Sequence, residues 1–267
     1  MKPKSRSRLD TKSWFFSKDI FLFDLDGTLY LGNRVLPGAL ELIEKLNAAS
    51  KKIYFFTNNS SRSEVDYIEK LSKMGFPVEA DQIIMSTHIL IRYLKSKNIN
   101  RIYLLGTPAM ASMIEAAGIR IDESTPESIV VGFDKTLTYE KLKRACELIE
   151  KRIPYIVTHP DLYCPTDHGR EPDCGTIARA LELVTEASPK IVLGKPHPMM
   201  MREAVLRSKG STRQIVLTGD RLSTDIEMAR ASKVESLLVL SGETTPSKLK
   251  QSRIKPTFVV RSVADLI

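Results

Sequence analysis

DIFLFDLDGT, residues 19–28, sets the architecture of this chain. The apolar run within residues 19–25 predicts a buried strand, because strands of a parallel sheet are covered on both faces. Asp24 and Asp26 stand where this strand ends, and Gly27 permits the abrupt turn that leaves it. Ligands of open parallel α/β sheets bind beyond the carboxyl ends of the strands. We therefore expect a site at this end of the sheet.

The two carboxylates indicate a cation site. In an extended segment Asp24 and Asp26 point to the same side, because side chains alternate with a period of two. They repel each other unless a cation lies between them or one of them keeps a proton. Hard oxygen ligands favour Mg²⁺. A surface Asp-Gly turn without any ligand is the alternative reading of this motif taken alone.

The flanking sequence predicts helices and strands in alternation. Apolar residues at 39, 42, 43 and 46 form one stripe of a helix that begins after Pro37-Gly38. Residues 52–56 predict the next strand. The pattern Ser61-x-x-Glu64 predicts a capping box, and the helix that follows ends at Gly75. This βαβα order is typical of a parallel sheet covered by helices.

The pattern resumes near the C-terminus and leaves a separate segment between. Further strands of the same sheet are expected at Lys190–Leu193, Gln214–Thr218, Ser236–Leu240 and Thr257–Val260. The intervening part has strands and helices of its own and is long enough to bury a core. We predict a basic N-terminal tail at 1–18, a core formed by 19–83 and 188–267, and an inserted α/β domain at 84–187.

Composition narrows the class of protein. The chain has 267 residues with a net charge of +8, but five basic residues and one acidic residue place +4 of this in the first twelve positions. We interpret that segment as a solubilising terminus, which disfavours a nucleic-acid partner. No apolar run is long enough to span a membrane, and the first twelve residues lack the apolar centre that is expected of a secretory signal. The three cysteines have no C-x-x-C spacing and predict free thiols in the cytoplasm.

Three more polar motifs follow predicted strands. Thr57-Asn58 offers a hydroxyl and an amide suited to phosphoryl oxygens, although a loop cap uses the same groups. Lys195 in Gly194-Lys195-Pro196 is a candidate phosphate clamp or a solvated surface charge. Asp220 and Asp225 follow the strand at 214–218, where either could cap a helix. Both acids beside Asp24 and Asp26 favour a metal-binding cluster.

These motifs, in this order, resemble those of the haloacid dehalogenase (HAD) superfamily. The insertion is similar to the cap of subclass IIA, the NagD-like and p-nitrophenyl-phosphatase group. The motifs are Asp24-x-Asp26-Gly27-Thr28, Thr57-Asn58, Gly194-Lys195-Pro196 and Gly219-Asp220-x-x-x-Thr224-Asp225. The resemblance implies a HAD-like Rossmannoid core, a parallel sheet with helices on both faces, plus an inserted α/β cap of the C2a type.

The resemblance also implies a phosphatase with Mg²⁺ as cofactor. Asp24 would be the nucleophile that forms an aspartyl phosphate. Asp26 would protonate the leaving oxygen and then activate water. The metal would be held by Asp24, Asp220 and the backbone carbonyl of Asp26.

The remaining core motifs would bind the phosphoryl group. Thr57, Asn58 and Asn59 are expected to bind its oxygens, while Lys195 offsets their charge. Asp225 is expected to orient Lys195 or the waters on the metal. The absence of a Walker motif disfavours an ATP-driven motor.

Substrate choice is expected from the cap. The loop at 159–176 holds the candidate specificity residues Asp161, Tyr163, His168 and Arg170. Small phosphorylated metabolites are the expected substrates: sugar phosphates, nucleoside monophosphates, and esters like phosphoglycolate or p-nitrophenyl phosphate. A homodimer is compatible with the resemblance. A phosphotransferase, a phosphonatase, a phosphorylatable receiver module and a non-catalytic binding protein are the alternatives.

Overall fold

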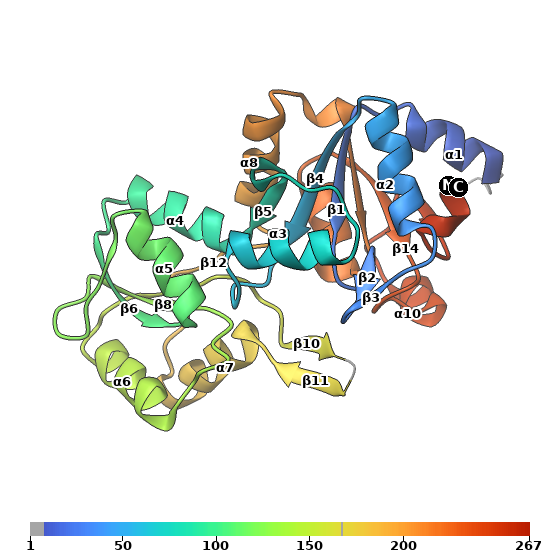
Figure 1. Cartoon of the computed structure of the whole chain (residues 1–267). Helices are drawn as coiled ribbons and strands as arrows, with labels where there is room; N and C mark the ends of the chain where they lie inside the picture. Colours follow the sequence, from blue (N-terminus) through green and yellow to red (C-terminus); the bar gives the residue numbers. More distant parts are fainter. Residues whose placement is uncertain (1–7, 167) are drawn as a thin grey trace. The chain divides into compact units, whose positions relative to one another are not determined.

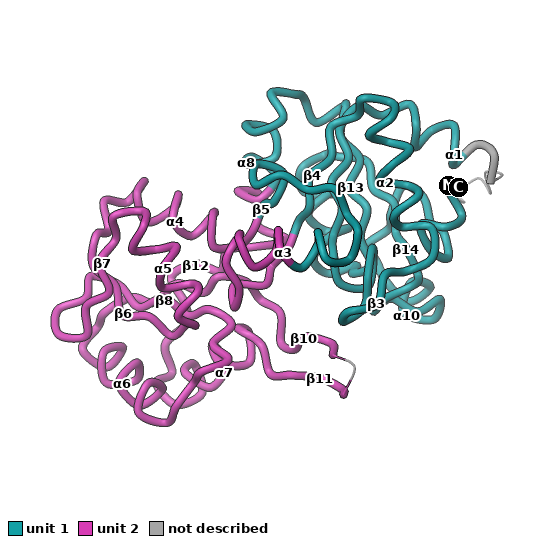
Figure 2. Tube along the Cα trace, viewed as in Figure 1, with its two compact units in different colours: residues 1–56, 70–84, 201–267 teal, residues 57–69, 85–200 magenta. Residues whose placement is uncertain are grey.

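The computed structural model describes residues 8–166 and 168–267 (Figure 1). Contacts divide the chain into two units (Figure 2). Unit 1 comprises the chain up to residue 56 together with 70–84 and 201–267, and unit 2 comprises 57–69 and 85–200. Unit 2 is thus larger than the expected insertion, because 57–69 and 188–200 make most of their contacts within it. The domain limits expected from the sequence stay a prediction.

The first sheet has six strands in the order β15-β14-β13-β1-β4-β5. The first five strands in this order run parallel to one another. Helices flank it (Figure 1), which confirms the predicted fold class. Its strands are β1 Ile20–Asp24, β4 Lys52–Thr57, β5 Ile83–Met85, β13 Ile215–Gly219, β14 Glu235–Val239 and β15 Phe258–Val260. The helices of this part of the chain are α1 Arg8–Phe16, α2 Ala39–Ala48, α3 Glu64–Lys73, α8 Pro198–Ser208, α9 Glu227–Ala231 and α10 Pro246–Gln251. Short strands β2 Tyr30–Leu31 and β3 Arg34–Val35 form a hairpin.

Local hydrophobic pattern explains the central elements. Every residue of β1 is buried, as expected for a strand between two parallel neighbours. The buried residues of α2 are Ala39, Leu42, Ile43 and Leu46, the stripe predicted from the sequence. Burial of this face, rather than helix propensity, supplies most of the stability of such a helix.

The expected basic tail is partly helical. Lys2, Lys4 and Arg6 lie outside the described residues, but residues 8–16 form α1. Phe15 is fully buried, and the Trp14 ring lies 4.2 Å from that of Phe258. The Lys12 ammonium donates to the carbonyl of Ile267. The last part of the expected tail is therefore folded as a helix, and the interpretation of residues 1–12 as a solubilising terminus stays a prediction.

Unit 2 contains a second, five-stranded parallel sheet, in the order β12-β9-β8-β6-β7. Its strands are β6 Arg101–Leu105, β7 Arg120–Ile121, β8 Ser128–Val131, β9 Tyr155–Val157 and β12 Ile191–Val192; its helices are α4 Ser86–Ser96, α5 Pro108–Ala116, α6 Tyr139–Glu150 and α7 Cys174–Thr185. The strand expected at Lys190–Leu193 therefore belongs to this sheet, and its assignment to the first sheet was wrong. It pairs with β9 through Ile191 and Ile156.

Two local predictions need correction. The segment at 159–176 is not a long loop, because β10 Tyr163–Thr166 and β11 Gly169–Pro172 pair as an antiparallel hairpin. The capping box of α3 is formed by Ser63 and Asp66, each of which accepts the backbone N–H of the other, at 3.1 and 2.7 Å. Ser61 instead donates its N–H to Asn59.

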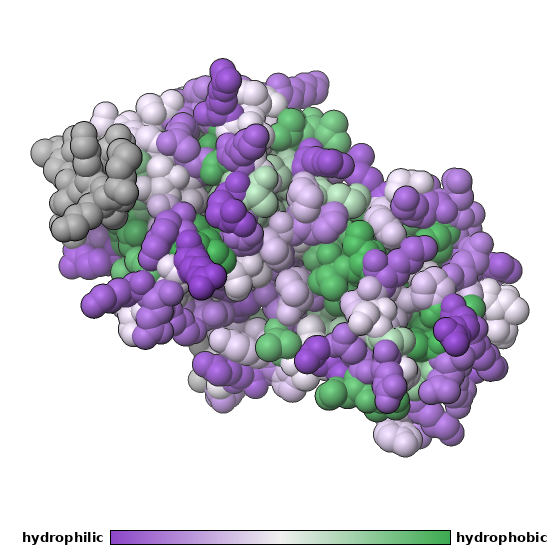
Figure 3. Space-filling view, turned by 180° about the vertical axis from the view of Figure 1, so that it is seen from behind, coloured by the Kyte–Doolittle hydropathy of each residue, from purple (hydrophilic) through white to green (hydrophobic). Residues whose placement is uncertain are grey.

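The polarity of the surface, the lengths of the helices and the state of the cysteines bear on the sequence predictions. On the face shown in Figure 3, hydrophobic side chains form separate groups among hydrophilic ones. Among the described residues, no helix is both long and apolar enough to cross a bilayer. Cys146, Cys164 and Cys174, all in the described part of the chain, form no disulfide, as predicted.

Candidate active site

Strand β1 ends at Asp24, and the chain turns immediately beyond it. Gly27 has φ +88° and donates its N–H to the carbonyl of Tyr30 at 2.7 Å. The carboxylate of Asp24 is 9% exposed and accepts a bond of 3.3 Å from the hydroxyl of Thr28. Asp26 is half-buried in the same turn.

Three carboxylates gather at this edge of the first sheet. Asp24, Asp220 and Asp225 each place one oxygen within 4.8 Å of the others. Because β1 and β13 are parallel neighbours, with Phe23 opposite Thr218, their ends meet at the same edge. Asp225 comes from a π-helical turn, Leu222–Ile226, and accepts the N–H of Arg221 at 3.1 Å. The side-chain cluster thus contains three of the four predicted acids, and the backbone carbonyl of Asp26 stays a predicted ligand.

Glycines make room for the central carboxylate. A β-carbon at Gly27 would lie 2.5 Å from Oδ2 of Asp220, and one at Gly242 would overlap the same oxygen. The N–H of Glu243 donates to that oxygen at 2.6 Å. The loop after β14 therefore fits closely around Asp220 and holds it in one position.

The electrostatics of the cluster fit a divalent cation. Burial and the neighbouring charges of Asp24 and Asp225 raise the pKa of Asp220 well above its ordinary value. Its Oδ1 is buried and has no hydrogen-bond partner among the described residues. A hard cation would neutralise the repulsion and supply the missing partner. The donor set therefore suits Mg²⁺.

The motif after β4 begins beside β1. Phe56 is the sheet partner of Asp24, and Thr57 is the next residue along β4. The hydroxyl of Thr57 lies 3.3 Å from that of Tyr67 and accepts the N–H of Asn59 at 3.1 Å. The Asn59 side chain accepts two bonds from Ser61, so it stabilises the loop.

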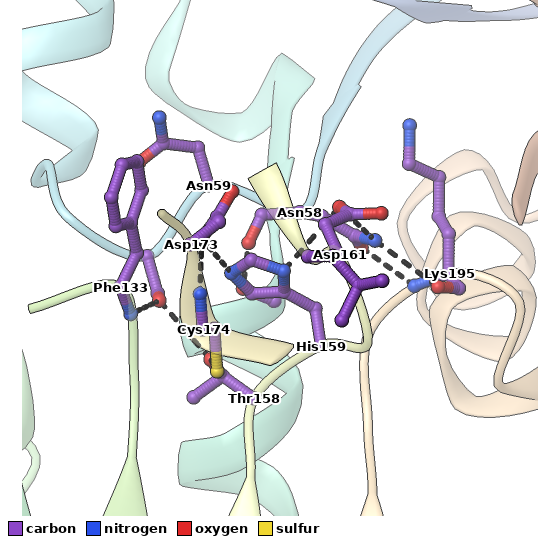
Figure 4. Close-up of polar contacts among 12 residues, drawn as sticks. Asn58, Asn59, Phe133, Thr158, His159, Asp161, Asp173, Cys174 and Lys195 are labelled. Atoms are coloured by element: carbon purple, nitrogen blue, oxygen red, sulfur yellow. Dashed lines mark hydrogen bonds and ion pairs between the residues drawn. The ribbon is translucent and has the colours of Figure 1, made fainter. Parts of the chain in front are cut away.

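Within unit 2, Asn58 contacts the other predicted phosphate motif (Figure 4). Its Oδ1 accepts the backbone N–H of Lys195 at 2.6 Å, and its Nδ2 donates to the Lys195 carbonyl at 3.1 Å. Lys195 is 3% exposed, and its side chain extends away from these backbone contacts. Gly194, with φ +68°, permits this approach because a β-carbon there would lie 2.7 Å from Asn58 Oδ1. The structure thus brings these two motifs together through the side chain of Asn58 and the backbone of Lys195, although Lys195 follows a strand of the second sheet.

Of the four candidate specificity residues, one lies before the β10–β11 hairpin and three lie on it. Asp161 lies before the hairpin and accepts a bond of 2.9 Å from Nδ2 of Asn58. Tyr163 and Arg170 lie across the hairpin, with the guanidinium 4.3 Å from the ring centroid. His168 is exposed near the tip of the hairpin.

Sequence reasoning missed a histidine. His159 is fully buried between the carboxylates of Asp161 and Asp173. The sequence signal was the His-Pro-Asp run at 159–161, which by itself indicates only a turn.

Comparisons with known proteins agree with this arrangement. Residues 21–120 match the family described as haloacid dehalogenase-like hydrolase, and residues 192–266 match a HAD-hydrolase-like family. The 4-nitrophenylphosphatase of Thermotoga maritima is 41% identical, with 98% of each chain covered and a TM-score of 0.90. The acid sugar phosphatase of Staphylococcus haemolyticus is 30% identical over 89% of this chain and 91% of its own. A glycerol phosphate phosphatase of Mycobacterium tuberculosis, solved in complex with magnesium, is 30% identical, with 94% of this chain and 76% of that one covered and a TM-score of 0.86. The chain therefore belongs to the haloacid dehalogenase superfamily, within the NagD-like, p-nitrophenyl-phosphatase group of subclass IIA.

Proposed function

We propose that this phosphatase hydrolyses small phosphomonoesters in a Mg²⁺-dependent reaction, through an aspartyl phosphate on Asp24. The buried cluster of Asp24, Asp220 and Asp225 carries the proposal, because it is a carboxylate site with an unsatisfied oxygen at a strand end. The relatives named for sugar, glycerol and nitrophenyl phosphates support the substrate class.

The chemistry divides between two acids. Asp24, Asp220 and the carbonyl of Asp26 would hold Mg²⁺, which supplies the charge neutralisation that a carboxylate needs to approach a phosphate dianion. A carboxylate oxygen of Asp24 attacks phosphorus, and the bond from phosphorus to the leaving oxygen breaks. Asp26 gives its proton to that oxygen, then takes one from the water that cleaves the aspartyl phosphate. Inorganic phosphate and free Asp24 result.

The other motif residues would position the phosphoryl group. Thr57, Asn58 and Asn59 are proposed to bind its oxygens, and Lys195 to offset their charge. Asp225, whose carboxylate is held by the N–H of Arg221, is proposed to orient Lys195 or the waters on the metal. Positioning and charge neutralisation supply most of the catalysis in phosphoryl transfer.

Specificity is proposed to come from Asp161, Tyr163, His168 and Arg170. Sugar phosphates, nucleoside monophosphates and phosphoglycolate-like esters remain the candidate substrates. No observation favours a phosphotransferase or a binding protein without activity. A cytoplasmic location and a homodimer stay predictions.

The test compares two aspartates at opposite ends of one strand. Chelator-treated protein should not hydrolyse p-nitrophenyl phosphate, and added Mg²⁺ should restore hydrolysis. Asp24→Asn should abolish turnover and leave the fold intact, because the amide is nearly isosteric but is not a nucleophile. Asp19→Asn, an exposed residue that pairs with Lys51 before β1, is the matched control and should remain active. Full activity without metal, or in Asp24→Asn, would contradict the mechanism.

A further inference from the structure

His159 lies between two carboxylates inside unit 2. Its Nδ1 is 3.3 Å from Oδ2 of Asp161, and its Nε2 is 3.4 Å from Oδ1 of Asp173. The imidazole is fully buried, and the two acids are nearly so. A carboxylate at each ring nitrogen favours the imidazolium form, which carries a proton on both.

Each carboxylate also contacts a second group. Oδ2 of Asp161 accepts the amide N–H of Asn58 at 2.9 Å. Oδ1 of Asp173 accepts the N–H of Cys174 at 2.6 Å, so Asp173 is the N-cap of α7. The imidazole therefore connects the loop after β4 with the start of α7.

The same residues close the base of the β10–β11 hairpin. The N–H of Asp173 donates to the carbonyl of Leu162 at 3.0 Å, and that of Gly175 donates to the carbonyl of Asp161 at 2.8 Å. A β-carbon at Gly175 would lie 2.8 Å from the Asp161 carbonyl oxygen, so only glycine allows this approach. The base of the hairpin is thus fixed on both strands.

We propose that His159 is a positioning residue: through Asp161 it holds the side-chain amide of Asn58 against the backbone of Lys195, and through Asp173 it holds the base of the hairpin that carries Tyr163 and Arg170. The proposal rests on the phosphatase function proposed above. Loss of the imidazole would leave two buried carboxylates facing each other without the cation between them, and such a pair is costly.

A metal ion is a poorer occupant of this cluster. The acids flank opposite ring nitrogens, whereas a ligating imidazole offers a metal one nitrogen. The carboxylate oxygens that face the ring already accept bonds from Asn58 and Cys174. The arrangement is that of two ion pairs at one imidazole, whose carboxylates are held by the N–H groups of Asn58 and Cys174.

The first measurement compares two histidines of unit 2. His159→Gln should lower kcat/KM for p-nitrophenyl phosphate by about tenfold to a hundredfold, since small displacements of a positioning group have effects of this size. His88 is the matched control, because it is partly buried and its Nε2 lies 3.6 Å from a carboxylate oxygen of Glu64. His88→Gln should keep kcat/KM within about twofold of wild type.

A double-mutant cycle separates positioning from general damage to the fold. If His159 acts through Asn58, then His159→Gln should add little, about twofold or less, to the loss already caused by Asn58→Ala. Losses that multiply would overturn the proposal. Asp173→Asn serves where His159→Gln does not fold, since asparagine can still cap α7 but carries no charge. It should show the same non-additivity with Asn58→Ala.

Two further outcomes are distinguished. A stoichiometric metal in the wild-type protein that His159→Gln loses, measured by elemental analysis, would make the cluster a metal site and overturn the proposal. A fully active Asn58→Ala would also overturn the positioning proposal. A wild-type protein without Mg²⁺-dependent activity would instead refute the function on which the proposal rests.

Discussion

Asp220→Asn should stabilise the metal-free protein against unfolding. The Asp220 side chain is buried, and one oxygen of each of Asp24 and Asp225 lies within 4.8 Å of one of its own. Two unit charges 4.8 Å apart repel by about 3.5 kcal/mol at an effective dielectric constant of about 20. The folded protein avoids part of this cost by keeping a proton on Asp220. We therefore expect a net gain of about 1–3 kcal/mol in the free energy of unfolding, within the usual range for one substitution.

The gain should depend on pH. Burial and the two neighbouring carboxylates raise the pKa of Asp220 in the folded protein. The folded state therefore keeps a proton that the unfolded chain releases near its ordinary pKa of about 3.9. Metal-free wild-type protein loses stability as the pH rises from that value through the raised pKa. The advantage of Asp220→Asn should be absent below this window and complete above it.

The free energy of unfolding is measured in urea with a chelator present, once at a pH at the acid end of this window and once near pH 8. The difference between variant and wild type at each pH gives the gain in stability and its dependence on pH. Excess Mg²⁺ should reverse the order, because the wild-type protein gains stability by binding the cation and the variant does not. Asp81→Asn, an exposed carboxyl of the same unit, is the control and should show neither effect. A metal-free Asp220→Asn that is less stable than wild type near pH 8 would refute the electrostatic reasoning.

Four further outcomes are expected. Asp26→Asn should lose more activity on alkyl phosphates than on p-nitrophenyl phosphate, whose phenolate leaves more easily; equal losses would contradict its role as an acid. Gly242→Ala should weaken Mg²⁺ binding measured by calorimetry, because its β-carbon would displace a carboxylate oxygen of Asp220. Phe15→Ala should lower the free energy of unfolding by about 3–5 kcal/mol, measured in urea, as for other buried aromatic residues. Arg170→Ala should change kcat/KM unequally among phosphorylated metabolites, and a uniform change would remove Arg170 from substrate recognition.

Local sequence pattern was sufficient where an element is long and buried on a regular face. The apolar run of β1 and the stripe of α2 depend on periodicity alone, which a sequence displays directly. The acids at the ends of β1 and β13 followed from the same logic, because parallel strands end at a common edge.

Strand pairing, helix capping and side-chain contacts that depend on tertiary structure could not be predicted from local sequence pattern. The sequence of a two-residue strand such as β12 does not indicate which sheet the strand joins. Its hydrogen-bonded pairing with β9 places it in the second sheet. Two overlapping capping patterns begin at Ser61 and Ser63, and Asn59 resolves the competition by binding Ser61. His159 became recognisable only when folding placed Asp173, fourteen residues later, against its ring.

The position of β1 in the first sheet has a consequence during synthesis. One edge of β1 pairs with β4, which emerges early, but its other neighbour, β13, begins at Ile215, 195 positions after Ile20. At about 5–20 residues per second, translation of that interval takes about 10–40 s. All of residues 85–200 emerge in the meantime, so unit 2 has time to fold first. Through this interval one edge of the largely apolar strand β1 has no partner, and unpaired edges of this kind promote association with other chains. Nascent-chain aggregation should therefore depend on how soon residues 215–219 leave the ribosome.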